Sequence, residues 1–158
     1  MMTIRRMTAV ALATAVMVTA MAQKTATTNM EIFREKIKAD KKLVVAQNLN
    51  LTEAEGAAFW PVYDAYQRDL QPINQRLAAT ILAYAEAYNQ GPLTNETAKK
   101  LLDESLAIDT AEERLKTAIV PKILAVLPAT KAARYIQIEN KIRAAVRYEL
   151  AASIPLVE

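Results

Sequence analysis

The chain has 158 residues and a formal net charge of +3, with 53% hydrophobic and 23% charged residues, a composition that supports a packed core. It contains no histidine, no cysteine and only two glycines, Gly56 and Gly91. These absences exclude thiol chemistry, histidine-based catalytic triads and glycine-dependent phosphate-binding loops. We therefore expect no catalytic residues, no metal site and no bound cofactor, and we do not expect an enzyme.

Residues 1–22 have the pattern of an export signal. Two arginines precede an uncharged stretch over residues 8–19, and Ala20-Met21-Ala22 supplies the small-x-small cleavage pattern. This stretch is too short to span a bilayer, which needs roughly 20 apolar residues. We predict cleavage after Ala22 and periplasmic localisation, with an uncleaved anchor as the alternative. The remaining residues 23–158 form one predicted helical domain, whose low net charge argues against nucleic-acid binding.

Two capping boxes open the first two predicted helices. The first, over Thr28–Glu31, begins a helix that runs to about Gln47. The second joins Thr52 to Glu55 and begins a helix of about 36 residues, or ~54 Å at 1.5 Å per residue. Apolar residues recur along the second helix in steps of three and four: Phe59, Tyr63, Tyr66, Leu70, Ile73, Leu77, Ile81, Tyr84 and Tyr88.

Two prolines lie inside the second predicted helix. Pro61 and Pro72 each remove a backbone donor, so we expect a kink near both. The apolar stripe keeps its phase across both prolines, which predicts one bent, continuous helix. Gln90-Gly91-Pro92 predicts its end, because glycine often follows the last helical turn and proline cannot continue it.

Two more helices complete the prediction. The third runs from Thr94 or Asn95 to about Leu127, is bent by Pro121, and has an apolar stripe of Leu101, Ile108, Leu115, Ile119, Ile123 and Val126. Leu127-Pro128-Ala129 opens the fourth, with a face of Tyr135, Ile138, Ile142, Val146 and Leu150. The predicted fold is all-α, with four helices: a long, kinked antiparallel hairpin flanked by shorter N- and C-terminal helices. Because so long a hairpin leaves apolar surface exposed, we also expect a curved homodimer.

Two helix openings resemble a known family. Leu51-Thr52-Glu53-Ala54-Glu55 and Leu127-Pro128-Ala129-Thr130-Lys131 are similar to the repeated LTxxQ signature of the Spy/CpxP family of periplasmic stress proteins. This sequence has Glu55 where the motif has its glutamine, and Pro128 where the second copy of the motif has its threonine. The resemblance implies a thin, curved helical dimer that holds unfolded clients without ATP or restrains a stress sensor.

A closer likeness covers most of the predicted domain. Phe59-Trp60-Pro61-Val62-Tyr63, Ala133-Arg134-Tyr135 with Gln137 and Glu139, and Ile154-Pro155-Leu156 resemble a group of small exported proteobacterial proteins of unassigned function.

Candidate partner-binding residues fall into an aromatic and a basic set. Tyr63, Tyr66, Tyr84 and Tyr88 share one helix face, which suits either a client-binding platform or a seam between helices. On the fourth helix one side carries Lys131, Arg134 and Lys141, and another carries Arg143 and Arg147.

These basic sides of the helix could bind acidic clients or an anionic membrane surface, or they could simply be exposed to water. Residues 50–128 carry seven basic and eleven acidic side chains, so the basic sides could also attach the outer helices to the middle ones or to a second subunit.

The carboxylates of Asp109, Glu112 and Glu113 lie within one helical turn, a spacing that allows an acid/base pair or a weak cation site. We favour ordinary ion pairs with lysines four residues away: Glu112–Lys116, Lys99–Asp103 and Lys100–Glu104. The leading hypothesis is a periplasmic, ATP-independent chaperone-like or envelope-stress protein that binds partly unfolded envelope proteins. The alternatives are a regulatory or structural protein that docks on one envelope partner, and a membrane-surface binder.

Overall fold

The computed structural model describes residues 41–157 and divides the chain into two units, residues 1–48 and 49–158. The predicted export signal and the Thr28–Glu31 capping box lie outside the described residues. In the first unit the described residues, 41–48, are helical.

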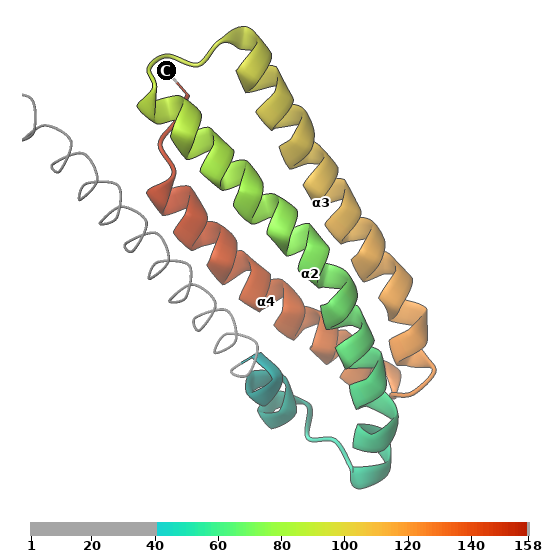
Figure 1. The fold of residues 1–158 in the computed structure, drawn as a ribbon. Coiled ribbons are helices and arrows are strands. Elements are labelled where there is room, and N and C mark those ends of the chain that lie inside the picture. The colour runs from blue at the N-terminus through green and yellow to red at the C-terminus, as the bar shows by residue number, and fades with distance from the viewer. Residues whose placement is uncertain (1–40, 158) are drawn as a thin grey trace, which may run out of the picture. The chain divides into compact units, whose positions relative to one another are not determined.

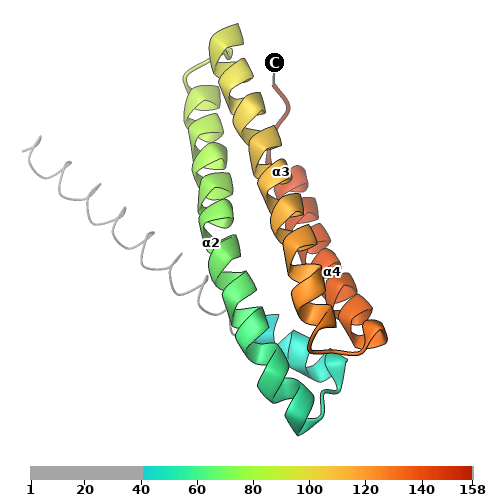
Figure 2. The same ribbon diagram turned by 90° about the vertical axis from the view of Figure 1, so that its right-hand side faces the viewer.

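The second unit contains three long helices, α2 (Glu53–Asn89), α3 (Asn95–Leu124) and α4 (Ala129–Ser153). Figures 1 and 2 show α2 and α3 as an antiparallel hairpin, with the shorter α4 running back beside it. The part of the chain that the structure describes contains helices, turns and no strands. The predicted all-α fold, built on a long hairpin and a shorter C-terminal helix, is confirmed.

The start of α2 is the predicted capping box. The Thr52 hydroxyl accepts a hydrogen bond from the Glu55 N–H at 3.2 Å, and the Glu55 carboxylate accepts one from the Thr52 N–H at 2.7 Å. These bonds satisfy donors that the first turn of a helix leaves without partners.

The helix α2 then continues for 37 residues through Pro61 and Pro72, so the predicted continuous helix is confirmed. Both prolines face solvent, and the helix axis bends in its N-terminal third (Figure 2). Gly91, with φ at 123°, follows the last turn in a backbone conformation that favours glycine.

The helix α3 begins where predicted and ends earlier than predicted. The Thr94 hydroxyl accepts from the Thr97 N–H at 3.2 Å and caps the first turn. The last helical residue is Leu124, not Leu127, and Pro121 lies in the final turn. The residue before a proline is disfavoured in helical geometry, so Pro128 requires the chain to leave the helix before Leu127.

The helix α4 turns most of the predicted face inward. Pro128 precedes its first residue without a side-chain cap, as its fixed φ allows. The buried residues are Ala132, Tyr135 and Glu139, whereas Val146 of the predicted face is exposed. Tyr135 of the predicted face is fully buried and Ile138, Ile142 and Leu150 are half-buried, so the predicted face lies inward except at Val146, and Glu139 joins it.

The core lies at one end of this unit. It is formed by the N-terminal half of α2, α3 from Ile108 onward, the turn after α3 and the start of α4: Phe59, Tyr63, Tyr66, Leu70, Ile73, Ile108, Ile119, Ile123, Leu127 and Tyr135. Phe59 and Tyr135 meet edge to face, with ring centroids 5.1 Å apart. Residues 74–107, which form the other half of the hairpin, include no fully buried residue. We call this half the distal hairpin.

Candidate functional site

The predicted aromatic face divides into a buried and a surface part. Tyr63 and Tyr66 are only 3% and 4% exposed and pack in the core, where Tyr63 contacts the Tyr135 ring edge-on. Tyr84 and Tyr88 lie in the distal hairpin and are half-buried, with ring centroids 5.9 Å apart. The first two tyrosines thus form the helix seam, and only the second two present aromatic surface to solvent.

A buried carboxylate lies among the core tyrosines. Glu139 of α4 accepts a hydrogen bond from the Gln67 side chain of α2 at 3.1 Å. Burial, and then the charge of Glu139, raises the pKa values of three hydroxyls well above their usual value, those of Tyr63, Tyr66 and Tyr135. Glu139 follows Tyr135 by four residues, so helical spacing alone places it on the tyrosine's side.

The two motif-like segments meet in the fold. The Lys131 ammonium donates to the Glu55 carboxylate at 2.6 Å and to the Asn50 carbonyl at 2.9 Å. The Glu55 oxygen that binds Lys131 also accepts the Thr52 N–H of the capping box. Lys131, followed by the Thr52 N–H, lowers the pKa of Glu55. A glutamine at position 55 would carry no charge for Lys131, so the ion pair depends on the carboxylate of Glu55.

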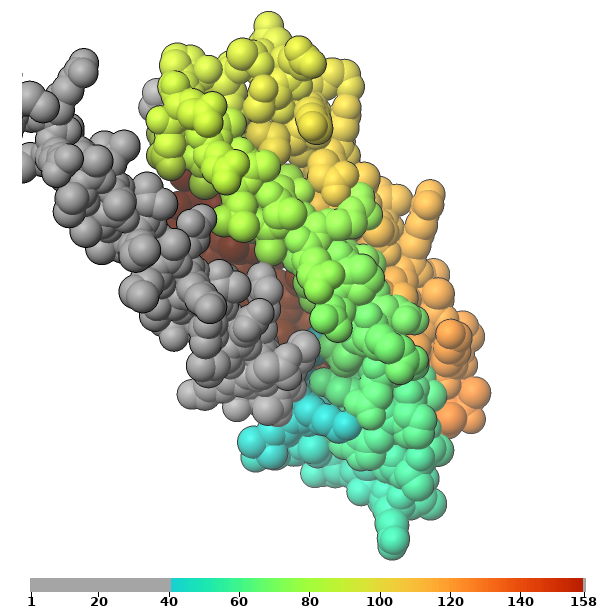
Figure 3. All heavy atoms as spheres, viewed as in Figure 1, coloured from blue at the N-terminus to red at the C-terminus, as the bar shows by residue number. Residues whose placement is uncertain are grey.

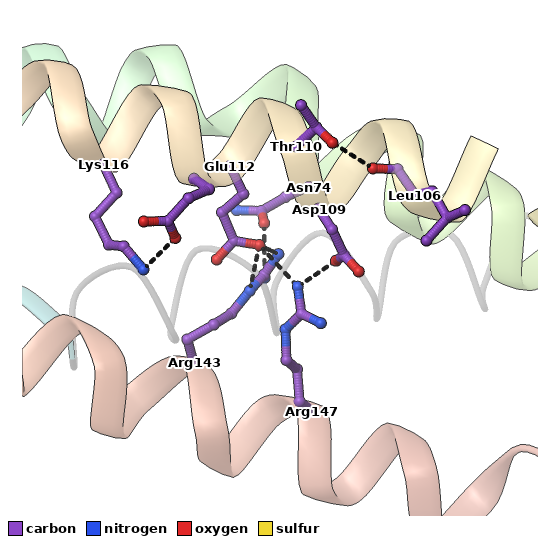
Figure 4. A network of polar contacts seen from close by, with 9 residues as sticks. Asn74, Leu106, Asp109, Thr110, Glu112, Lys116, Arg143 and Arg147 are labelled. Atoms are coloured by element: carbon purple, nitrogen blue, oxygen red, sulfur yellow. Dashed lines mark hydrogen bonds and ion pairs between the residues drawn. The ribbon is translucent and has the colours of Figure 1, made fainter. Parts of the chain in front are cut away.

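The second basic side of α4 binds the acidic middle of α3 (Figure 4). The Arg143 guanidinium donates twice to Glu112, once at 2.8 Å from Nε, and donates from Nη1 to Asn74 Oδ1 of α2 at 3.1 Å. Arg147 donates to Asp109 at 2.5 Å and to Glu112 at 3.2 Å, and these contacts, Asp109 foremost, raise the pKa of Arg147. Of the alternatives left open by the sequence, the structure shows opposed charges attaching α4 to the middle helices here.

A pocket of about 430 Å³ lies over this ionic network and is lined by Asp109, Glu112, Glu113, Lys116, Asn140, Arg143, Ala144 and Arg147. Its two central carboxylates, Asp109 and Glu112, are already bound by guanidinium groups. The arrangement therefore fastens α4 to α3 and α2.

Local ion pairs within α3 follow the predictions only in part. Lys99 and Asp103 pair at 2.5 Å, as predicted. Lys116 pairs with Glu113 at 2.7 Å rather than with Glu112, which Arg143 of α4 binds instead. A forked guanidinium from a facing helix bonds a carboxylate more strongly than a flexible lysine on the same helix.

The predicted partner of Lys100 is also taken by another helix. Glu104 receives two hydrogen bonds from the Arg76 guanidinium of α2, at 2.9 and 3.2 Å, so the Lys100–Glu104 prediction is wrong. The bidentate contact lowers the pKa of Glu104 and raises that of Arg76. It also fastens the two arms of the distal hairpin, where apolar burial is slight.

The first predicted basic side of α4 is only partly available to a partner. Lys131 is turned toward Glu55, whereas Arg134 and Lys141 remain exposed, two helical turns apart. These last two are the basic residues of the predicted set that face solvent.

The far end of the distal hairpin, at the α2–α3 turn, is the yellow-green end of the molecule in Figure 3. Tyr88 lines a pocket of about 160 Å³ together with Gly91, Pro92 and Leu93. We call Tyr84, Tyr88, Pro92 and Leu93 the tip surface. Further along the hairpin, Leu102 and Leu106 of α3 are each more than half exposed.

Comparison with family models, curated proteins and solved structures finds no match. The resemblance to the Spy/CpxP family therefore stays a prediction from the sequence. Over residues 41–157, no group of three or more acidic side chains is placed to hold a metal ion. In the same range, no helix combines the length and apolar character needed to cross a bilayer.

Proposed function

We propose that this protein is a periplasmic, ATP-independent chaperone-like or envelope-stress protein that binds partly unfolded polypeptides. The observation that carries the proposal is the division of the aromatic stripe. Its first half builds a core, and its second half continues as Tyr84 and Tyr88 into a hairpin arm with no fully buried residue.

This arrangement suits transient binding of many sequences. Tyrosine rings offer apolar contact and a hydroxyl at little conformational cost, so they accept varied partners. The distal hairpin also carries charges of both signs, including the exposed pair of Lys99 and Asp103. Apolar contact framed by charges is the usual anatomy of a transient interface.

The proposal includes a homodimer. Leu102 and Leu106 are four residues apart on α3, so they lie one above the other on one side of that helix. Packing this side against a second copy would remove both leucines from water. Light scattering during size-exclusion chromatography should give twice the chain mass, and Leu102→Ser with Leu106→Ser should give a monomer. A monomeric parent protein would refute this part.

Suppression of aggregation tests the binding function. Reduced lactalbumin should scatter less light when the purified protein is added at up to equimolar ratio. Tyr88→Ser should weaken this effect, whereas Tyr148→Ser should not, because Tyr148 is a highly exposed tyrosine outside the tip surface. If the parent protein leaves scattering unchanged, the chaperone function is refuted.

The alternative is a regulatory protein that docks on one envelope partner, and the exposed pair of Arg134 and Lys141 favours an acidic surface for it. A pulldown separates the two functions. A single stoichiometric partner, lost in Arg134→Ser with Lys141→Ser, supports regulation. A broad range of captured proteins, unaffected by that variant, supports chaperoning.

A further inference from the structure

The C-terminal segment of the chain contacts Tyr84 of the tip surface. Beyond Ser153, the end of α4, Ile154 is extended, with φ at −92° and ψ at 119°. Figures 1 and 2 show the segment continuing past α4 toward the α2–α3 turn. There the Tyr84 hydroxyl donates a hydrogen bond to the Pro155 carbonyl oxygen at 3.0 Å, across 71 residues of sequence.

This contact is made to the backbone of the segment. The Leu156 side chain is 88% exposed and that of Val157 is also exposed. A single hydrogen bond contributes only about 1 kcal/mol net. Tyr84 therefore binds an extended chain through a backbone carbonyl group, which every residue carries. The contact is weak enough for the chain to be released.

The surroundings of this hydrogen bond can accept side chains. The Tyr88 ring lies beside Tyr84, and the 160 Å³ pocket next to it is lined by Pro92 and Leu93. Tyrosine rings beside an apolar pocket are typical of surfaces that bind proline-containing extended peptides, because the fixed φ of proline keeps the chain extended before it binds.

We propose that residues 154–157, the tail, occupy in cis a binding site for extended, proline-containing apolar segments, and that clients compete with the tail for Tyr84 and Tyr88. This inference rests on the proposed function and deepens it by naming the conformation and chemistry of the client segment. The tail competes with client segments for this site. A client that binds the site too weakly to displace the tail is therefore excluded, and a client that displaces the tail is held.

The first experiment uses a variant that ends at Ser153, together with a synthetic peptide of residues 152–158 as the probe. In an NMR titration the shortened protein should bind the peptide about twofold more tightly than the full chain does, because a weakly held tail at an effective concentration of about 1 mM occupies about half of the sites. Tyr84→Phe in the shortened protein should weaken binding by about fivefold, the value of one hydrogen bond. Tyr148→Phe is the matched control and should change nothing. Equal peptide binding by the shortened and full chains, or no effect of Tyr84→Phe, overturns the proposal.

A second measurement uses the full chain and does not depend on the folding of the shortened variant. The ¹³C chemical shift of the Pro155 carbonyl should move in Tyr84→Phe and stay in place in Tyr148→Phe. An unmoved Pro155 signal in Tyr84→Phe means that the hydrogen bond does not form, and overturns the proposal.

Aggregation assays separate this proposal from the proposed function. Stronger suppression by the shortened protein than by the full chain supports competition between tail and client. If both proteins suppress aggregation equally, the tail proposal fails and the chaperone function stands. If neither suppresses aggregation while the shortened protein binds the peptide, the chaperone function fails, and with it the competition with clients.

Discussion

The ion pair between Arg143 and Glu112 should be a main energetic link between α3 and α4. Its two side chains are 19% and 14% exposed, and Arg143 also reaches Asn74 of α2. We consider Arg143→Met, Glu112→Gln and the double variant. The single variant Arg143→Met leaves Glu112 with only the 3.2 Å contact from Arg147.

The magnitude lies between two known limits. Breaking a fully buried ion pair costs about 3–5 kcal/mol, whereas exposed pairs contribute about 0–1 kcal/mol. Since both side chains are mostly but not fully buried, we expect each single variant to lose about 2 kcal/mol. The coupling free energy should be about 1–2 kcal/mol, because the double variant leaves no uncompensated charge. For a unit of this size, a loss of about 2 kcal/mol lowers Tm by roughly 8 °C.

Urea unfolding followed by circular dichroism at the four corners of the cycle measures this coupling. A matched control cycle on Lys99 and Asp103, whose side chains are 74% and 60% exposed, should give at most about 0.5 kcal/mol. The reasoning is refuted if the Arg143–Glu112 coupling is no larger than that of the control pair.

Two further predictions concern pH. Because the pKa of Glu55 in the folded protein lies below its ordinary value of 4.5, its stabilising contribution is complete above that value and is lost as pH falls through the folded-state pKa. Glu55→Gln should therefore be less stable at neutral pH, with a deficit that shrinks below pH 4.5 in chemical unfolding; a deficit independent of pH contradicts this. In the alkaline range, the pKa values of Tyr63, Tyr66 and Tyr135 are raised in the folded protein, so their contribution to stability is complete below about pH 10 and is lost as pH rises above it. The tyrosinate absorbance of these three residues should therefore rise together with the loss of helical circular dichroism. Tyrosinate formation by all six tyrosines of the chain before any helix loss would contradict it.

The helices of this protein were predictable because their signals are local. The Thr52–Glu55 capping box and the Gly91-Pro92 stop lie within a few residues of the helix ends that they define. The unbroken apolar phase across Pro61 and Pro72 correctly predicted one helix. Such signals depend on backbone sterics and on spacing, both of which are readable in a single sequence.

The side chains that connect the helices were harder to predict. Arg76 displaced the local lysine at Glu104, and the partner of the buried Glu139 is Gln67, 72 residues away. Helical spacing places Glu139 on the side of Tyr135, but a partner in a distant segment has no signature in periodicity. The same limit applies to the contact between Tyr84 and the tail, which joins two segments with no shared pattern.

One oxygen of Glu55 serves two contacts that form at different moments of synthesis. Thr52 is adjacent and available at once, but Lys131 emerges 76 residues later. A growing chain can thus begin the first turn of α2 early, yet it completes the charge balance there only after most of the molecule exists.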